Sequence, residues 1–189
     1  MIVEPIVVLG SLTSAAKDID DVHRRVDNLP FAVTLYGRKT NQVWISDNGM
    51  VSLDGDNAGR LYTDALARQY KDANPLPFNA DDFSKYAVFP LWADLKICKG
   101  FKHGVFYKVT GAVPTRTLTI EWLITQWEEE EDYYHFSATF EEGRPGVVTF
   151  KYNAIDGSAG AKCTVGVQGG SRESCLLSGT RVAFLETNI

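Results

Sequence analysis

Hydrophobic and polar residues alternate along most of this chain, in short runs separated by turn-forming residues. The clearest run covers residues 133–140, where large and small apolar residues stand at every second position. A period of two places successive side chains on opposite faces of an extended strand, so each run predicts a strand with one buried face. Weaker runs of the same kind cover 31–35, 43–53, 87–95, 104–109, 117–125, 148–152 and 163–168.

Turn residues join these predicted strands into antiparallel hairpins. Asn48-Gly49 separates two alternating runs, and we expect a two-residue type I′ turn there because both central positions need φ > 0. Such a turn sets the register that puts the apolar residues of both strands on shared faces. Asp47 and Asn48 are therefore interpreted as determinants of the fold rather than as ligands.

The N-terminal stretch predicts a strand followed by a helix. Pro5 restricts the strand, residues 2–9, to the edge of a sheet, unless the proline stands at the start of the strand. The helix, residues 15–26, is expected because three apolar residues at spacings of three and four form one narrow stripe: Ile19, Val22 and Val26. His23 lies beside that stripe and is expected at the surface.

A long polar stretch, residues 56–86, interrupts the β pattern. Residues 60–72 predict a short helix, and residues 73–85 a loop of a length that is often functional. The Asp, Asn and Gly residues of 54–59 are typical of calcium loops, but they lack the EF-hand spacing and are interpreted as a turn.

Sequential hairpins of this kind predict a mainly β protein, a two-sheet antiparallel β-sandwich. We expect a single domain over residues 1–189, with an N-terminal strand and helix extension (1–28) and one inserted helical loop (56–86).

Charge and length exclude some classes of partner. The chain of 189 residues has a net charge of −5, and its basic residues do not cluster. Nucleic acids and anionic membranes are bound through Lys and Arg patches, so neither is expected. We expect no membrane span, because no apolar run approaches the roughly 20 residues needed. The short run Ile6–Leu9 follows Glu4 rather than basic residues, which favours a cytoplasmic protein or a secreted one without its leader.

Three cysteines, Cys98, Cys163 and Cys175, are too few for a disulfide-built scaffold. Cys163 and Cys175 fall in consecutive predicted strands, where a disulfide across the hairpin and a pair of buried thiols are both open alternatives. The chain has no CxxC pattern and no Cys/His cluster, so no metal site and no cofactor are expected.

Two carboxylate–imidazole sets are candidates for acid–base chemistry. Glu121 and His135 fall on the polar side of neighbouring predicted strands, and Asp94 and His103 flank the end of the strand at 87–95. Such pairs transfer protons when burial moves their pKa values toward neutrality. An ordinary cross-strand surface pair is the simpler interpretation of the first set. A pocket for a small hydrophobic molecule would be walled by Trp92, Trp122 and Tyr134.

A recognition module would use other aromatic residues. Sandwiches bind through end loops or through an aromatic-rich sheet face, and the candidates for an outer face are Trp44, Tyr107 and Tyr133. The alternative is that each of them covers a second apolar layer. An oligomerising role through the edge of the first strand is a third hypothesis, and the oligomeric state is left open.

Ordered blocks over roughly residues 29–168 resemble a nidogen-like β-sandwich module with a Ser-x-Asn-Gly hairpin: 29–37 followed by 43–53, then 89–95, 104–107, 118–122, 136–141, 147–152 and 161–168. That module accompanies bacterial secreted peptidases and adhesins and occurs in uncharacterised fungal secreted proteins. The resemblance implies an extracellular sandwich with no shared catalytic residues. We therefore predict a non-catalytic recognition or accessory domain that binds protein or carbohydrate. The alternative is a small-molecule enzyme that uses Glu121/His135 or Asp94/His103.

Overall fold

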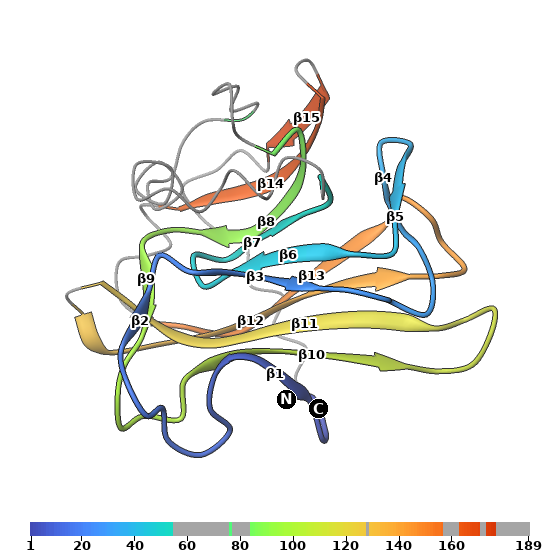
Figure 1. Ribbon diagram of the computed structural model, residues 1–189. Helices are drawn as coiled ribbons and strands as arrows, with labels where there is room; N and C mark the ends of the chain where they lie inside the picture. The colour runs from blue at the N-terminus through green and yellow to red at the C-terminus, as the bar shows by residue number, and fades with distance from the viewer. Residues whose placement is uncertain (55–75, 77–83, 128, 157–162, 171–172, 177–189) are drawn as a thin grey trace.

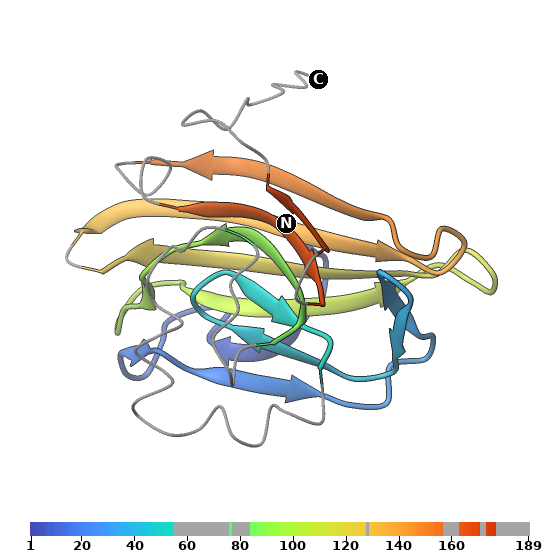
Figure 2. The same cartoon turned by 90° about the horizontal axis from the view of Figure 1, so that it is seen from above.

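The structure is a computed structural model that describes residues 1–54, 76, 84–127, 129–156, 163–170 and 173–176 (Figure 1). Its described part consists of β-strands and loops, and every strand pair in it is antiparallel. The strands form two main sheets, and in the view from above in Figure 2 strands of the two sheets overlie one another. The predicted antiparallel β-sandwich is confirmed.

The larger sheet has seven strands. Its main order is β1 (Ile6–Gly10), β10 (Gly104–Thr110), β11 (Thr117–Gln126), β12 (Glu129–Glu141) and β13 (Val148–Ile155). The short strand β9 (Leu95–Ile97) pairs with the end of β11, and β2 (Ile19–Asp20) pairs with β9. The first strand lies at the edge of this sheet, as Pro5 led us to expect.

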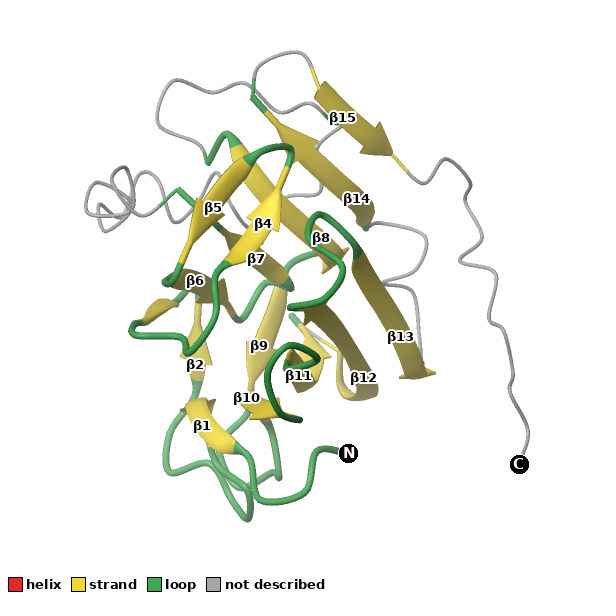
Figure 3. Ribbon diagram, turned by 90° about the vertical axis from the view of Figure 1, so that its right-hand side faces the viewer, coloured by secondary structure: helices red, strands yellow, loops and turns green. Residues whose placement is uncertain are grey.

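The smaller sheet has six strands, in the order β15 (Glu173–Leu176), β14 (Thr164–Gly169), β8 (Tyr86–Trp92), β7 (Met50–Ser52), β6 (Val43–Ser46) and β3 (His23–Val26). A separate hairpin of β4 (Val33–Leu35) and β5 (Arg38–Thr40) stands at one end of the sandwich (Figure 3). Tyr36 and Gly37, both at positive φ, form its two-residue turn, as a type I′ turn requires.

One apolar core fills the space between the two sheets. The alternating residues of β11 and β12 supply its centre, where Trp122 stacks on Phe136 with ring centroids 5.1 Å apart. A polar bond also crosses the core: Tyr152 Oη of β13 donates to the carbonyl of Pro90 in β8 at 2.5 Å. The alternation in the sequence predicted these buried faces correctly because each strand has one face toward this core.

The turn between β6 and β7 differs from the expected type I′ geometry. Ser46 pairs with Met50, so the loop has three residues, and of these only Gly49 has a positive φ, at 69°. A three-residue loop with Gly in the left-handed position is the next commonest hairpin solution. The longer loop leaves the Asn48 side chain to bond two other segments, to the Asp21 carboxylate and to the Leu95 amide.

The prediction of an N-terminal helix at residues 15–26 is wrong. Ile19 pairs with Ile97 in β9, and His23–Val26 pairs with β6, so both pieces are strands. The backbone reverses between them at Asp21, which has φ = 53°. Spacings of three and four were coincidental here, because pairing with distant strands overrides a weak local pattern. His23 is buried rather than exposed, which also corrects the prediction.

Two further predictions, the inserted helix and loop and the Cys163–Cys175 disulfide, concern segments that the structure describes only in part. The predicted helix at 60–72 lies outside them, as does nearly all of the loop at 73–85. The β14–β15 register sets Cys175 opposite Val167, four residues beyond Cys163. Four residues along a strand span about 13 Å, and a disulfide needs Cα atoms within about 7 Å. The register therefore does not favour the Cys163–Cys175 bridge.

Candidate functional site

The two members of the first acid–base set meet on the outer face of the larger sheet. Glu121 lies opposite Ser137, and His135 lies opposite Leu123, so the two are diagonal neighbours across β11 and β12. His135 Nε2 is 2.7 Å from Glu121 Oε1. The sequence predicted this contact because the two strands are consecutive and their alternation fixes the register. A catalytic role for the pair stays a prediction.

Glu121 is only 3% exposed and is well supplied with hydrogen-bond donors. Besides His135, the Ile2 amide donates to its Oε2 at 2.9 Å. Burial acts to raise the pKa of Glu121, but these hydrogen bonds and the nearby positive charges outweigh it and hold the pKa below its ordinary value. Glu121 is therefore a carboxylate at neutral pH, held in place on both oxygens.

Tyr133 stands beside this pair. Its ring is tilted against His135 with centroids 6.1 Å apart, and it is half-buried. Burial, together with the Glu121 charge, raises the pKa of the Tyr133 phenol. The phenol is thus neutral, and the three side chains form one polar cluster on the sheet face.

The second acid–base set does not form a comparable cluster. His103 is buried in the loop before β10, where its Nδ1 accepts a hydrogen bond from the Cys98 amide at 3.3 Å and its ring stacks on Phe101. Burial lowers the pKa of His103. Asp94 lies instead with Asp20 and Asp21, whose carboxylate oxygens come within 4.8 Å of its own. These three are the described side chains that are grouped closely enough to hold a metal ion.

The three aromatic residues expected to wall a pocket are core residues. Trp92, Trp122 and Tyr134 have no exposed surface, and each packs within the sandwich: Trp92 stacks on Phe89 at 5.0 Å. Fully buried rings stabilise the fold and leave no surface for a ligand. Trp44, expected on an outer face, is also buried, with the Arg25 guanidinium 5.7 Å from its ring centroid.

Tyr107 is half-buried and lines a cleft of about 330 Å³ between β10 and the segment before β4. The opposite wall is formed by Asn28, Leu29 and Pro30, and Lys108 stands at the rim beside Glu4. The Lys108 ammonium is bonded to the Val3 carbonyl and lies 3.9 Å from the Glu4 carboxylate. Of the predicted binding aromatics, Tyr107 lines this cleft and Tyr133 lies in the Glu121–His135 cluster.

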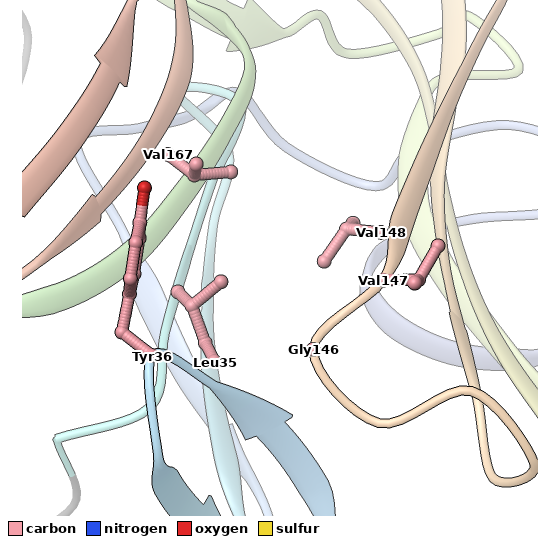
Figure 4. A pocket seen from close by; sticks show the side chains of 6 residues that line it. All are labelled: Leu35, Tyr36, Gly146, Val147, Val148 and Val167. Atoms are coloured by element: carbon pink, nitrogen blue, oxygen red, sulfur yellow. The ribbon is translucent and has the colours of Figure 1, made fainter.

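A second cleft, which the sequence analysis did not identify, opens at the β4–β5 turn. Its volume is about 360 Å³, and we call it the Tyr36 cleft after the exposed tyrosine that lines it. Figure 4 shows Leu35, Tyr36 and Val167 on one side, with Gly146, Val147 and Val148 across from them. The cleft thus lies between β14 of the smaller sheet and the start of β13 in the larger one.

Both the backbone and the side chain of Tyr36 are held in place by the fold. Its φ of 45° belongs to the tight turn, and its ring lies directly against Gly169 of β14, where any Cβ would come within 2.2 Å of the ring. Tyr36 as a whole residue is nevertheless 40% exposed. In the sequence, the pair Tyr36-Gly37 ends the alternating run at 31–35, and only the structure shows that this bulky aromatic stands at a positive φ, which is uncommon.

A comparison with known protein families bears on these surfaces. The family model described as NIDO related matches residues 5–187, nearly the whole length of the chain. The chain belongs to the NIDO-related family. No curated protein and no solved structure matches it. The nidogen-like resemblance is confirmed, while the association with bacterial and fungal secreted proteins stays a prediction.

Membership in the NIDO-related family favours a non-enzymatic extracellular module. Two sequence blocks that carried the resemblance meet in the NIDO-related structure, because Asn48 Oδ1 accepts a hydrogen bond from the Leu95 amide at 2.8 Å. Within the described residues, no helix has the length and apolar character needed to cross a membrane.

Proposed function

We propose that this NIDO-related chain is a non-catalytic recognition module that binds an extended segment of a protein partner in the Tyr36 cleft. One observation carries the proposal: an exposed aromatic residue is fixed by a tight turn beside a cleft that is lined by aliphatic side chains. Tyrosine is enriched among residues that dominate binding energy, since it offers a large contact area at small entropic cost. A ring already held by Gly169 loses little further freedom on binding.

The lining of the cleft favours protein over carbohydrate. Leu35, Val147, Val148 and Val167 present aliphatic groups, and Tyr36 contributes a phenol. Sugars need several convergent hydrogen-bonding groups beside an aromatic face, whereas an apolar side chain of a protein segment is matched by aliphatic walls. In the described order of the sheet, β13 is the last strand after β12, which suits a segment that adds to its edge.

The enzyme alternative has less support. Efficient general acid–base catalysis needs a pKa near the working pH, and the pKa of Glu121 lies below its ordinary value. Both Glu121 oxygens are engaged, by His135 and by the Ile2 amide. The contact between Glu121 and His135 is therefore better explained as a cross-strand pair that stabilises the sheet face.

The test is a selection of peptides from a random phage-displayed library against the purified chain, followed by calorimetric titration of the selected peptides. We expect sequences with an aliphatic or aromatic anchor. Tyr36→Asn is the informative variant, because Asn accepts the positive φ while the ring is lost. Its affinity for these peptides should fall by about tenfold or more.

Leu12→Ser is the matched control, since Leu12 is 36% exposed but belongs to the loop after β1, away from the cleft. It should bind like the wild type. Selected peptides that bind Tyr36→Asn and wild type equally would contradict the proposal, and so would binding confined to a glycan array. Turnover in a substrate screen that Glu121→Ala and His135→Ala abolish would favour the enzyme alternative instead.

A further inference from the structure

Three acidic residues converge where the chain crosses from one sheet to the other. Asp20 ends β2 of the larger sheet, and Asp21 follows it at the turn into β3 of the smaller sheet. Asp94 occupies the reverse crossing, between β8 of the smaller sheet and β9 of the larger. Both crossings lie side by side because β2 pairs with β9.

The three carboxylates are close enough to share one ion. One oxygen from each lies within 4.8 Å of the others, and each residue is partly exposed. Calcium binds oxygen at about 2.3–2.6 Å, so two of its ligands can be separated by up to about 5 Å. Three carboxylates with room for water suit a cation that takes six to eight oxygen ligands in flexible geometry.

A fourth carboxylate behind them gives an independent indication. Asp47 has no exposed surface, and its side chain reaches into the β2–β3 turn, where Oδ1 accepts a hydrogen bond from the Val22 amide at 2.9 Å. Its Oδ2 is shielded from solvent and has no hydrogen-bond partner. A buried carboxylate oxygen without a donor is costly, and a nearby cation would compensate it.

The electrostatics agree with this geometry. Asp20, Asp21 and Asp94 bring three carboxylates together, with one oxygen of each within 4.8 Å of the others, and the charges of Asp20 and Asp21 also act on Asp47. A divalent cation would relieve the repulsion among these carboxylates.

Asn48 holds the turn in position for such a site. Its Nδ2 donates to Asp21 Oδ1 at 2.9 Å, while its Oδ1 accepts from the Leu95 amide. The one side chain therefore ties the Asp21 turn to the strand that follows Asp94. This orienting contact is typical of the groups that surround metal ligands.

We propose that Asp20, Asp21 and Asp94 form a calcium site, with Asp47 behind it, that clamps the two sheet crossings together. This site is separate from the Tyr36 cleft, and its test does not depend on the recognition function. Calcium sites of extracellular modules are weak, with dissociation constants of about 10⁻⁴ to 10⁻³ M.

The test is thermal unfolding of the purified chain with CaCl₂, MgCl₂ or EDTA, together with luminescence of Tb³⁺ sensitised by tryptophan. CaCl₂ at about 10 mM should raise the Tm by about 5 °C, and calcium should displace bound Tb³⁺. Asp20→Asn and Asp94→Asn should each lose the shift in Tm and weaken Tb³⁺ binding by about tenfold or more.

Asp27→Asn is the control, since Asp27 is a partly exposed carboxylate paired with Arg25 at 2.8 Å. It should respond to calcium like the wild type. The proposal is overturned if CaCl₂ leaves the wild-type Tm unchanged or if the wild type does not bind Tb³⁺. It is also overturned if CaCl₂ raises the Tm of Asp94→Asn as much as it raises that of the wild type. An equal shift with MgCl₂ would contradict the assignment to calcium.

Discussion

The indole Nε1 of Trp122 in β11 donates a hydrogen bond of 2.8 Å to the main-chain carbonyl of Ser46 in β6. Both residues are fully buried, so this bond joins the two sheets through the centre of the core. It also satisfies a carbonyl just before the β6–β7 turn. The hairpin that carries the family-like Ser-x-Asn-Gly block is thereby fixed to the opposite sheet.

Trp122→Phe should destabilise the fold. The substitution leaves the Ser46 carbonyl buried without its donor and opens a cavity beside Phe136, for a combined cost of about 3 kcal/mol. Urea unfolding followed by circular dichroism measures this loss. Trp127→Phe is the control, because Trp127 is 41% exposed, and its cost should stay within about 0.5 kcal/mol. Equal costs for the two variants would contradict the role given to the indole.

Gly49→Ala should be far more harmful than Gly146→Ala. Both glycines have positive φ, at 69° and 83°, but a Cβ at Gly49 would lie 2.0 Å from the Leu91 carbonyl oxygen, whereas Gly146 has open space. The backbone strain alone costs about 1 kcal/mol at either position. We expect that cost for Gly146→Ala, and at least about 3 kcal/mol or failure to fold for Gly49→Ala. The free energies of unfolding in urea measure the difference, and similar values would contradict the packing.

Stability should depend on pH through His23. Burial lowers its pKa from 6.5 to about 4, so below pH 6.5 the unfolded chain binds a proton that the native state excludes. The neutral His23 imidazole therefore contributes fully to the free energy of unfolding above pH 6.5. This contribution, about 3 kcal/mol, is lost as the pH falls toward 4. His23→Gln should remove this slope.

The measurement compares the free energies of unfolding of wild type and His23→Gln between pH 4 and 7. The raised pKa of Asp47 changes stability with pH in the opposite direction. Asp47 is present in both proteins, so its effect cancels when the two free energies of unfolding are subtracted. The wild type should lose stability relative to the variant as the pH falls. A difference that stays constant over this range would contradict the buried neutral imidazole.

Much of the larger sheet could be predicted from the sequence because its strands are neighbours along the chain. Alternation in 117–125 and 133–140 gives both the buried faces and the register, and the register brings Glu121 to His135. The N-terminal strands could not be predicted in this way. Ile19 pairs with Ile97, and His23 with Ser46, and such distant pairing leaves no local signal.

The candidate sites follow the same division. The Glu121–His135 contact lies within one hairpin and was predicted, whereas Asp20 and Asp94 are brought together by the crossings between sheets. The Tyr36 cleft was missed for a similar reason: Tyr36 meets Gly169 of β14 and faces Val148 of β13 only after both sheets have assembled. The alternating run at 31–35 was visible in the sequence, but the neighbours that Tyr36 meets were not.

The most direct test of the recognition proposal is chemical-shift mapping with ¹⁵N-labelled protein and a peptide selected for binding. We predict that the largest changes in amide shifts occur at Tyr36 and Val167 on one side of the cleft and at Gly146–Val148 on the other. Changes centred on Glu121 and His135, or on Tyr107, would contradict it.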